Sequence, residues 1–462
     1  MVKALKVILI IVAVVMALAI IVVGVGIYIT NRYLQTPAFK EQALQAAHKE
    51  LGADVRIDDL KVSIFSGVEL RGVTIGNPPG FPGNLVTAEA FVLRYRLLPL
   101  LSRRVEIEEL SLDKPVITLS QNAGGEWNYA KLGPPETQTT PTTSPSTTPS
   151  PAATPKSEKS VPLDVVLSKL AITQGALSMV SDSNKPIVKV DGIDFSSSVS
   201  LTDNKLSGTG KAGIDKINLS DKLFVEKAGT QVQLEPDHVT LSPLRGELAG
   251  GTISGSVSVN YATGMTYAVS VQLTNSDVAR LLQDASSRPT ISGKLNVATS
   301  LAGTGGVPTI VGNGRVEIDN GQLTETPILS LLAGILQLDA LRNLSFDRCL
   351  LEYSISNNVM QTPVFRLTSP QVQITGKGFV SLDKYTLHHN MRLTLAKGAL
   401  DGALLPGIRE LFAEQPDGSL TRDFKVWGPY NSPKTDLTKR IGQQLLQNGL
   451  QQLFKGAPPA LQ

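Results

Sequence analysis

The chain has 462 residues, 42% of them hydrophobic, and its 43 basic and 40 acidic residues leave a formal net charge of +3. A balance so close to neutral lacks the basic footprint of nucleic-acid-binding proteins, so we expect no nucleic-acid partner. One cysteine, Cys349, excludes an internal disulfide and a multi-cysteine metal site. It lies in a predicted strand, where a small buried core residue is the expected role.

The first element is a long apolar segment. From Val7 to Ile29 there is no charged residue, and at 1.5 Å per residue the run covers roughly the 30 Å hydrocarbon thickness of a bilayer. A cleaved signal peptide is the competing interpretation, because Ala17-Leu-Ala19 resembles a cleavage site, but further apolar residues follow it. Lys3 and Lys6 precede the segment, which places the N-terminus in the cytoplasm. We therefore predict a cytoplasmic stub and transmembrane anchor at 1–30.

The next element, from Phe39 to Leu51, has the periodicity of a short helix, and Gly52 is its expected stop. Beyond it, apolar and polar residues alternate with a period of two. Such alternation is typical of strands in antiparallel sheets that are covered on one face only. The clearest examples lie at 91–97, 256–261, 267–273 and 387–395.

Residues 133–160 are rich in Pro, Thr and Ser and contain almost no apolar residue. Such a composition cannot bury enough surface to offset the entropy lost on ordering, so a flexible linker is predicted. It divides the body into an N-terminal β unit at 31–132 and a C-terminal β region at 161–462.

Within the C-terminal region a short phrase recurs at irregular spacing, which excludes a strict solenoid repeat. Its glycines are expected to mark bulges or bends; the copies are Leu206-Ser-Gly208, Ile253-Ser-Gly255, Ile291-Ser-Gly293 and Ile374-Thr-Gly376. Two helices are predicted to interrupt the strands. Thr326 to Leu344 is apolar on nearly every side and should be buried, whereas Asp436 to Lys455 is amphipathic with a glutamine-rich face.

The motifs that resemble catalytic or cofactor sites are better explained as strands. Gly208-Thr-Gly210-Lys-Ala-Gly213 matches the dinucleotide fingerprint by letters, but an alternating strand follows it where the fingerprint needs a helix. His388 and His389 would point to opposite faces of a strand, which is unsuited to metal chelation. The three glutamates within 106–109 are expected on a solvated strand and turn. We therefore expect no catalytic residues, no metal and no cofactor, and do not predict an enzyme.

The N-terminal β unit contains strand and turn motifs in a particular order. They are Leu60-Lys-Val-Ser-Ile-Phe-Ser-Gly-Val-Glu-Leu-Arg-Gly-Val-Thr-Ile75, Asn77-Pro-Pro-Gly-Phe81, Leu97-Leu-Pro-Leu-Leu101, Val105-Glu-Ile107, Leu110-Ser-Leu-Asp-Lys-Pro-Val-Ile-Thr-Leu119 and Gly125-Glu-Trp-Asn128. The C-terminal region adds Gly314-Arg-Val-Glu-Ile-Asp-Asn-Gly-Gln-Leu323 and Gly376-Lys-Gly-Phe-Val-Ser-Leu382. Behind an N-terminal membrane helix, this order resembles the AsmA family of bacterial inner-membrane-anchored periplasmic proteins.

The resemblance implies a mainly β fold: an elongated, groove-like antiparallel β-sheet with a few helices, preceded by a single N-terminal transmembrane helix. It also implies a relation to chorein-type bridge proteins, which conduct lipids, and a role in phospholipid transport and outer-membrane biogenesis. The expected location is the bacterial inner membrane, with a single pass and the body in the periplasm. Expected partners are the inner membrane, phospholipid, and outer-membrane or periplasmic assembly proteins.

Two roles stay open for the apolar strand faces. In an open groove they would hold acyl chains while the headgroup stays in water, and the candidates for lining it are Phe91, Leu93, Tyr95, Val257, Val259, Tyr267, Val269, Val271 and Leu393. In a closed sandwich the same faces would pack on each other. The protein would then be a non-catalytic scaffold or regulator of outer-membrane protein assembly.

Overall fold

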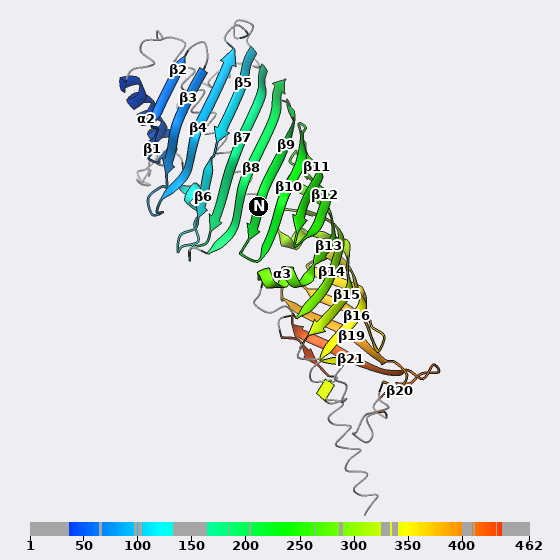
Figure 1. Ribbon diagram of the computed structural model, residues 1–462. Helices are drawn as coiled ribbons and strands as arrows, with labels where there is room; N and C mark the ends of the chain where they lie inside the picture. The colour runs from blue at the N-terminus through cyan, green and yellow to red at the C-terminus, as the bar shows by residue number, and fades with distance from the viewer. Residues whose placement is uncertain are drawn as a thin grey trace, which may run out of the picture. The chain divides into compact units, whose positions relative to one another are not determined.

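A computed structural model describes residues 37–63, 67–96, 99, 104–132, 164–183, 185–202, 205–262, 264–285, 290–324, 333–334, 341–399, 409, 412–430 and 432–436. The chain forms two compact units. The first comprises Met1–Ser220 and Gln231–Pro236, and the second comprises Asp221–Thr230 and Asp237–Gln462. Both are built mainly of antiparallel strands (Figure 1).

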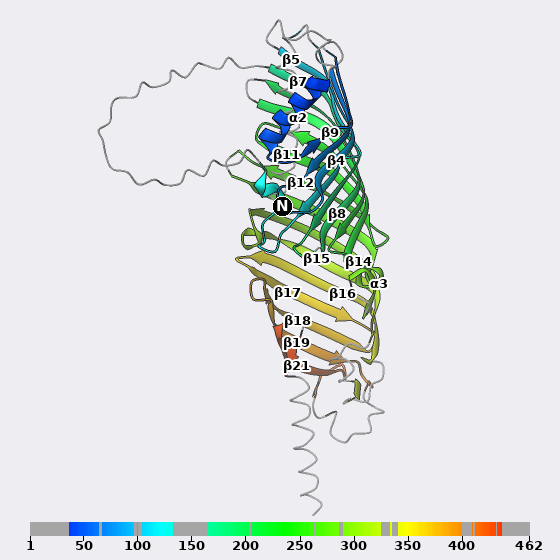
Figure 2. The same cartoon turned by 90° about the vertical axis from the view of Figure 1, so that its left-hand side faces the viewer.

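The first unit begins with the predicted helix, α2 (Pro37–Leu51). Gly52 ends it, as expected: its backbone has φ +64°, and its N–H donates to the His48 carbonyl at 2.9 Å. Ala47 and Leu51 are buried in a core with strand residues such as Ile75 and Leu85. Figure 2 shows α2 lying against one face of this unit's sheet. The amphipathic pattern therefore placed the helix correctly.

The strands of the first unit pair mostly with their neighbours in sequence. Their bounds are β1 (Val55–Arg56), β2 (Asp59–Ser63), β3 (Gly67–Gly76), β4 (Asn84–Arg96), β5 (Arg104–Asp113), β6 (Val116–Ser120), β7 (Asp164–Val180), β8 (Pro186–Thr202) and β9 (Lys205–Leu219), with a 3₁₀ turn, η2 (Asn128–Lys131), after β6. Strand β3 pairs with β1, β2 and β4, and β4 pairs with β5 and β6. Strand β7 departs from the antiparallel pattern, because it runs parallel to both β5 and β6.

Strand β10 (Leu223–Leu234) contributes residues to both units. The second unit continues as an antiparallel meander from β11 to β19, and β19 then pairs with β21. The bounds are β11 (His238–Leu248), β12 (Gly251–Asn260), β13 (Thr266–Asp277), α3 (Val278–Ala285), β14 (Ile291–Thr304), η3 (Val307–Thr309), β15 (Val311–Thr324), β16 (Asn343–Ser356), β17 (Val359–Thr368), β18 (Val372–Ser381), β19 (Thr386–Leu395), β20 (Ala413–Glu414), β21 (Leu420–Pro429) and β22 (Lys434–Thr435). Helix α3 was not predicted; Asp277 caps it by accepting the Arg280 N–H at 3.0 Å.

The recurring glycines lie mostly where the strand register is irregular. Gly293 lies within the register shift of β14, and Gly255 and Gly376 lie opposite the shifts of β11 and β17. At Gly208 the pairing is regular, but a Cβ atom there would approach the Ser198 carbonyl oxygen to 2.4 Å. The expectation of bulges is confirmed at Gly255, Gly293 and Gly376, whereas Gly208 is a site where two strands approach closely.

The two units divide at a different place from the predicted boundary. Residues 133–160 lie outside the described residues, but the strands on either side of them, β6 and β7, are paired, from Val116 with Ala176 to Ser120 with Val180. Both strands belong to the first compact unit, whose main segment ends at Ser220. A change in composition along the chain does not show whether the residues beyond it return to the same sheet.

The predicted anchor and the two predicted helices of the C-terminal region fall mostly outside the described residues. Val7–Ile29 and 437–455 lie outside the described residues, as does most of Thr326–Leu344. Within the latter, Ala333 and Gly334 are helical, Leu341 is fully buried as expected, and β16 already begins at Asn343. In the described part of the chain, no helix has the length and apolar character needed to cross a membrane.

The parallel ladder predicts how the protein responds to a cut between β6 and β7. With a protease site inserted in 139–154 and cleaved, the two fragments should co-elute as one particle under native conditions, because β7 pairs with both β5 and β6. Denaturation in urea should separate them. Fragments that separate in native buffer would contradict the pairing, and the uncleaved insertion variant is the control.

Candidate functional site

One face of the second unit carries a continuous line of apolar residues, which we call the apolar row. Directly paired residues of antiparallel strands point to the same side of a sheet, so the register of the strands defines the line. It consists of Leu241, Val257, Val269, Leu301, Gly312, Ile355, Met360, Val380, Leu387 and Gly428, one residue from each strand from β11 to β19 and from β21. At about 4.8 Å per strand it runs roughly 43 Å along the sheet.

A second line, on the opposite face, is polar over most of its length and is called the polar row. It comprises Ser256, Ser270, Ser300, Asn313, Ser354, Gln361, Phe379, His388 and Trp427. Ion pairs flank it, among them Arg315 with Glu352 at 3.5 Å and Arg392 with Asp423 at 2.6 Å. The hydrogen bond from Arg392 lowers the pKa of Asp423. The sheet of this unit therefore has one apolar and one solvated face.

Every residue of the apolar row is half-buried, and none belongs to a buried core cluster of the described residues. The neighbouring candidates Val259, Tyr267 and Val271 are also half-buried. Val259 pairs with Tyr267, and Val271 pairs with Gly255. Five of the predicted groove residues thus lie together on one partly exposed face.

The remaining candidates lie in closed cores. Phe91 and Leu93, each 4% exposed, belong to a cluster of the first unit, and Tyr95 packs against it. Leu393, 1% exposed, is enclosed in a cluster of the second unit that includes Phe412. Alternation marked these side chains as apolar-facing correctly, but it could not show that other parts of the chain cover them.

Glycines allow aromatic rings to lie flat on the apolar face. A Cβ atom at Gly314 would lie 2.4 Å from the Tyr353 ring, and one at Gly303 would lie 2.5 Å from the Tyr267 hydroxyl. Both glycines are cross-strand partners of these tyrosines. The Tyr353 hydroxyl donates to Thr299 Oγ1 at 2.8 Å.

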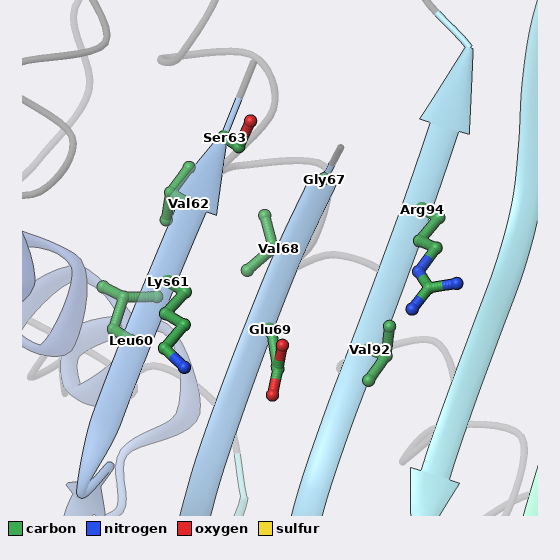
Figure 3. Close-up of a pocket in the computed structure, with 9 residues that line it drawn as sticks. All are labelled: Leu60, Lys61, Val62, Ser63, Gly67, Val68, Glu69, Val92 and Arg94. Atoms are coloured by element: carbon green, nitrogen blue, oxygen red, sulfur yellow. The ribbon is translucent and has the colours of Figure 1, made fainter. Parts of the chain in front are cut away.

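Hollows in the surface lie in both units. In the second unit, one of about 440 Å³ is lined by polar-row residues such as Ser270, Ser300 and Ser354. One of about 540 Å³ in the first unit is lined by Lys61, Glu69 and Arg94 among others (Figure 3). These charges have partners: Glu69 accepts from Arg71 at 2.7 Å, and Arg94 lies 3.4 Å from Glu109. A surface of paired charges shows no preference for a ligand of one sign.

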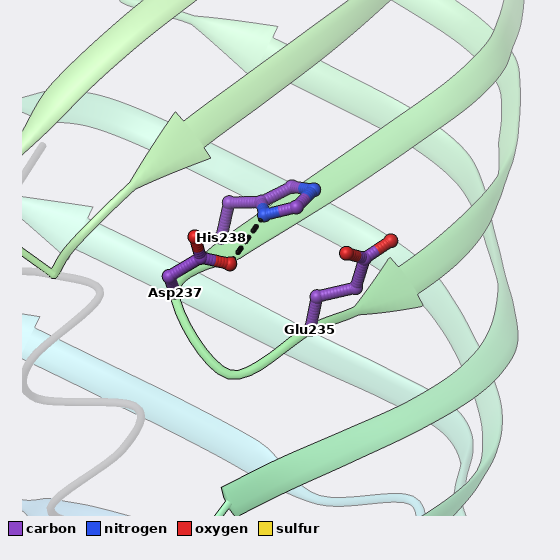
Figure 4. A group of neighbouring side chains, drawn as sticks. All are labelled: Glu235, Asp237 and His238. Carbon is purple, nitrogen blue, oxygen red and sulfur yellow. Dashed lines mark hydrogen bonds and ion pairs between the residues drawn. The ribbon is translucent and has the colours of Figure 1, made fainter.

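Glu235, Asp237 and His238 lie close together where the chain enters β11, and their potential ligand atoms are within 4.8 Å of one another (Figure 4). The Asp237 carboxylate and the His238 Nδ1 atom are 2.7 Å apart, and this contact lowers the pKa of Asp237. All three residues come from one stretch of four residues, so chain proximity alone accounts for the cluster. We assign no metal to this turn.

The other residues singled out in the sequence have structural roles. Cys349 packs against the core of the second unit, and burial raises the pKa of its thiol to about 11. The residues that match the dinucleotide fingerprint lie within β9. His388 stacks on Phe379, whereas the His389 Nε2 atom lies 2.6 Å from Thr362 Oγ1. Burial lowers the pKa of His389.

The three glutamates of β5 are paired with basic residues. Arg96 Nε donates to Glu108 at 2.6 Å and lies within 3.8 Å of Glu106 through its Nη1 atom, and Lys169 Nζ donates to Glu109 at 2.7 Å. The hydrogen bond from Lys169 lowers the pKa of Glu109. All three glutamates lie within β5, with no turn among them, and Glu108 is exposed whereas Glu106 and Glu109 are half-buried. The expectation of a solvated strand is therefore confirmed for Glu108.

The part of the apolar row in β14 to β18 was not predicted. Ile355 lies between Ser354 and Ser356, which is the alternation that could have marked it. Leu301, Met360 and Val380 each have an apolar neighbour (Ala302, Val359 and Phe379), so alternation is a weaker signal at these positions. Their alignment depends on the register of each strand pair. A bulge in β16 or β17 moves every later residue by one position, so the row cannot be followed from the sequence.

Comparison with models of known protein families identifies the family to which the chain belongs. The sequence model of the AsmA family matches residues 1–228 and 203–365, which is more than half of the chain. The chain belongs to the AsmA family. No curated protein and no solved structure matches it significantly. The two-faced sheet and its apolar row are the features of this AsmA-family protein that bear on its function.

Proposed function

We propose that this AsmA-family protein conducts phospholipid along the apolar row of its second unit. We also propose that residues 1–30 anchor it in the bacterial inner membrane, with the body in the periplasm, where it supports outer-membrane biogenesis. The observation that carries the proposal is the unbroken line of half-buried apolar residues across the strands of the second unit, with a solvated face opposite.

Moving a phospholipid through water without an apolar surface has a high free-energy cost. Exposing about thirty CH₂ groups of two acyl chains to water costs roughly 24 kcal/mol, at about 0.8 kcal/mol per group. Even a fraction of this cost makes free diffusion slow, because each ~1.4 kcal/mol lowers a rate tenfold. An apolar surface that a chain can follow from strand to strand removes most of this barrier while the headgroup remains in water.

The dimensions of the row support the same role. An acyl chain spans about half of the 30 Å hydrocarbon core, roughly 15 Å, so it would cover three or four strand spacings of about 4.8 Å. The row is longer than one chain, and its side chains are Val, Leu, Ile and Met with glycine at Gly312 and Gly428. Uniform chemistry without a charged side chain in the row favours sliding over tight binding at one position.

A photo-crosslinking experiment tests the proposal in the intact membrane protein. A benzophenone side chain at Val257, Val269 or Ile355 should capture phospholipid, because these residues lie in the apolar row. The adjacent positions Ser256, Ser270 and Ser354 lie in the polar row and should capture at least about tenfold less. Mass spectrometry of the crosslinked protein measures the adduct.

Equal capture at both sets of positions, or none in the apolar row, would contradict lipid conduction. Capture at Leu93 or Leu393 is not expected, since both are enclosed in cores. This differs from the expectation from alternation alone, in which every apolar strand face was equivalent.

The second candidate function is that of a non-catalytic scaffold or regulator of outer-membrane protein assembly. The observation that favours it is that Phe91, Leu93 and Leu393 are covered by other residues in closed cores. A protein in which the apolar row is also covered, by a partner protein, would show protein adducts in place of lipid adducts at Val257, Val269 and Ile355.

A further inference from the structure

The last strands of the second unit carry a group of exposed aromatic residues. Tyr385, in the turn between β18 and β19, is 64% exposed, and Tyr430, directly after β21, is 61% exposed. Their ring centroids lie 6.1 Å apart, and the Tyr430 N–H donates to the Tyr385 carbonyl at 3.1 Å. The end of the polar row lies close by: His388 is three residues after Tyr385, and Trp427 is three residues before Tyr430. His388 pairs with Trp427 and stacks on Phe379, which is 38% exposed.

This group also contains lysines. Lys434 pairs in register with Trp427, and Lys384 precedes Tyr385 in the same turn. Asn390 lies two residues after His388 on the same face of β19, and its two cross-strand partners are Lys377 and Lys425. We call these residues the aromatic–lysine end; it comprises Phe379, Tyr385, His388, Trp427, Tyr430, Lys377, Lys384, Lys425 and Lys434. Two acidic residues lie beside this end, fewer than its four lysines: Asp383 precedes Lys384, and Asp436 Oδ1 accepts the Lys425 N–H at 2.7 Å. Asp423 is paired with Arg392 at 2.6 Å.

The aromatic–lysine end lies directly beside the end of the apolar row. The row finishes at Leu387 and Gly428, each two residues from one of the exposed tyrosines. Tyrosine and tryptophan prefer the interface between hydrocarbon and water, where the ring is in an apolar region and the polar atom stays wet. Lysines beside such rings are attracted by anionic headgroups at close range.

We propose that the aromatic–lysine end docks on the surface of a lipid bilayer that contains anionic phospholipid, with the Tyr385 and Tyr430 rings at the level of the headgroups. Docking there would bring the end of the apolar row to the bilayer, so that an acyl chain could leave the row without crossing water. The inference rests on the proposed function for its purpose, but the docking itself depends only on the exposed rings and lysines.

The experiment uses the full chain in nanodiscs of unlabelled phosphatidylcholine. The chain has two tryptophans, so Trp127→Phe leaves Trp427 as the reporter within the aromatic–lysine end. Vesicles of brominated phosphatidylcholine, with or without phosphatidylglycerol, are then added, and bromine quenches a tryptophan that enters the bilayer interface. We expect quenching that is stronger with phosphatidylglycerol and that decreases as salt is raised.

Two double variants assign the effect to the named residues. Tyr385→Ser with Tyr430→Ser, and Lys384→Glu with Lys434→Glu, should each lower the apparent vesicle affinity by about tenfold or more. Tyr261→Ser is the matched control, because Tyr261 is an exposed tyrosine (38%) that lies after β12 in the same unit, away from this end. It should leave the affinity unchanged.

Each other outcome counts against docking. No quenching with either vesicle, or quenching that both double variants retain, would overturn the proposal. Quenching that requires membrane proteins in the added vesicles would mean that the partner is a protein. Lipid capture at Val269, measured in the same nanodiscs, separates the two proposals. Quenching of Trp427 without lipid capture at Val269 would contradict lipid conduction alone. Lipid capture at Val269 without quenching of Trp427 would contradict docking alone.

Discussion

Leu393→Asp should destabilise the second unit by at least about 4 kcal/mol, because it removes a fully buried side chain and places a carboxylate in an apolar core. Val269→Asp should cost about 1 kcal/mol or less, although Val269 also lies on an apolar strand face. In the half-buried apolar row the new carboxylate can reach water. Urea unfolding followed by the fluorescence of Trp427 in the Trp127→Phe background measures both, since Trp427 lies in β21 of this unit.

The same pair of variants bears on function. Val269→Asp should stay folded while lipid capture at the neighbouring Val257 falls at least about tenfold, because a charge in the row opposes the passage of an acyl chain. Ser270→Asp, one residue along on the polar row, is the control and should change neither stability nor capture. If Val269→Asp instead unfolds the unit as severely as Leu393→Asp, the row is part of a closed core and the open-face interpretation is wrong.

Gly312→Ala should be the most damaging single-methyl substitution in the apolar row. A Cβ atom at Gly312 would lie 2.1 Å from the Ser300 carbonyl oxygen and 2.9 Å from Leu301 Cα, both backbone atoms of the paired strand. Neither can move without breaking the β14–β15 pairing, so we expect a loss of roughly 3 kcal/mol in the free energy of unfolding.

Gly306→Ala is the control for this substitution. Gly306 lies in the turn that connects the same two strands, and the nearest atom to an added Cβ is Pro308 Cδ at 3.6 Å, an ordinary contact. It should change the free energy of unfolding by less than about 0.5 kcal/mol. A Gly312→Ala protein as stable as Gly306→Ala would show that β14 and β15 are not as close as the structure has them.

Much of the local structure could be predicted from the sequence because its causes are local. The helix from Pro37 to Leu51 and its end at Gly52 follow from side-chain periodicity and from the conformational freedom of glycine. The face of Val257, Val259, Tyr267 and Val269 follows from the period of two, since each side chain's direction depends only on its own strand.

What the sequence could not determine depends on contacts between distant residues. The parallel pairing of β7 with β5 and β6 joins residues on opposite sides of 133–160, and no local pattern encodes that choice. Helix α3 was missed because it is short and its cap, Asp277, also ends a strand.

The sequence by itself determined that strands of this AsmA-family protein have an apolar and a polar face, because alternation is a property of each segment. Only the tertiary structure decided which apolar residues are enclosed and which stay half-exposed: Leu393 is covered by residues from other segments, such as Phe412, whereas Val269 is not part of any core cluster of the described residues. It also decided that Val257, Val269 and Leu301 form one line, since that alignment depends on the register of every strand pair between them. The candidate path for lipid is therefore a consequence of pairing and coverage, which act between segments far apart in the chain.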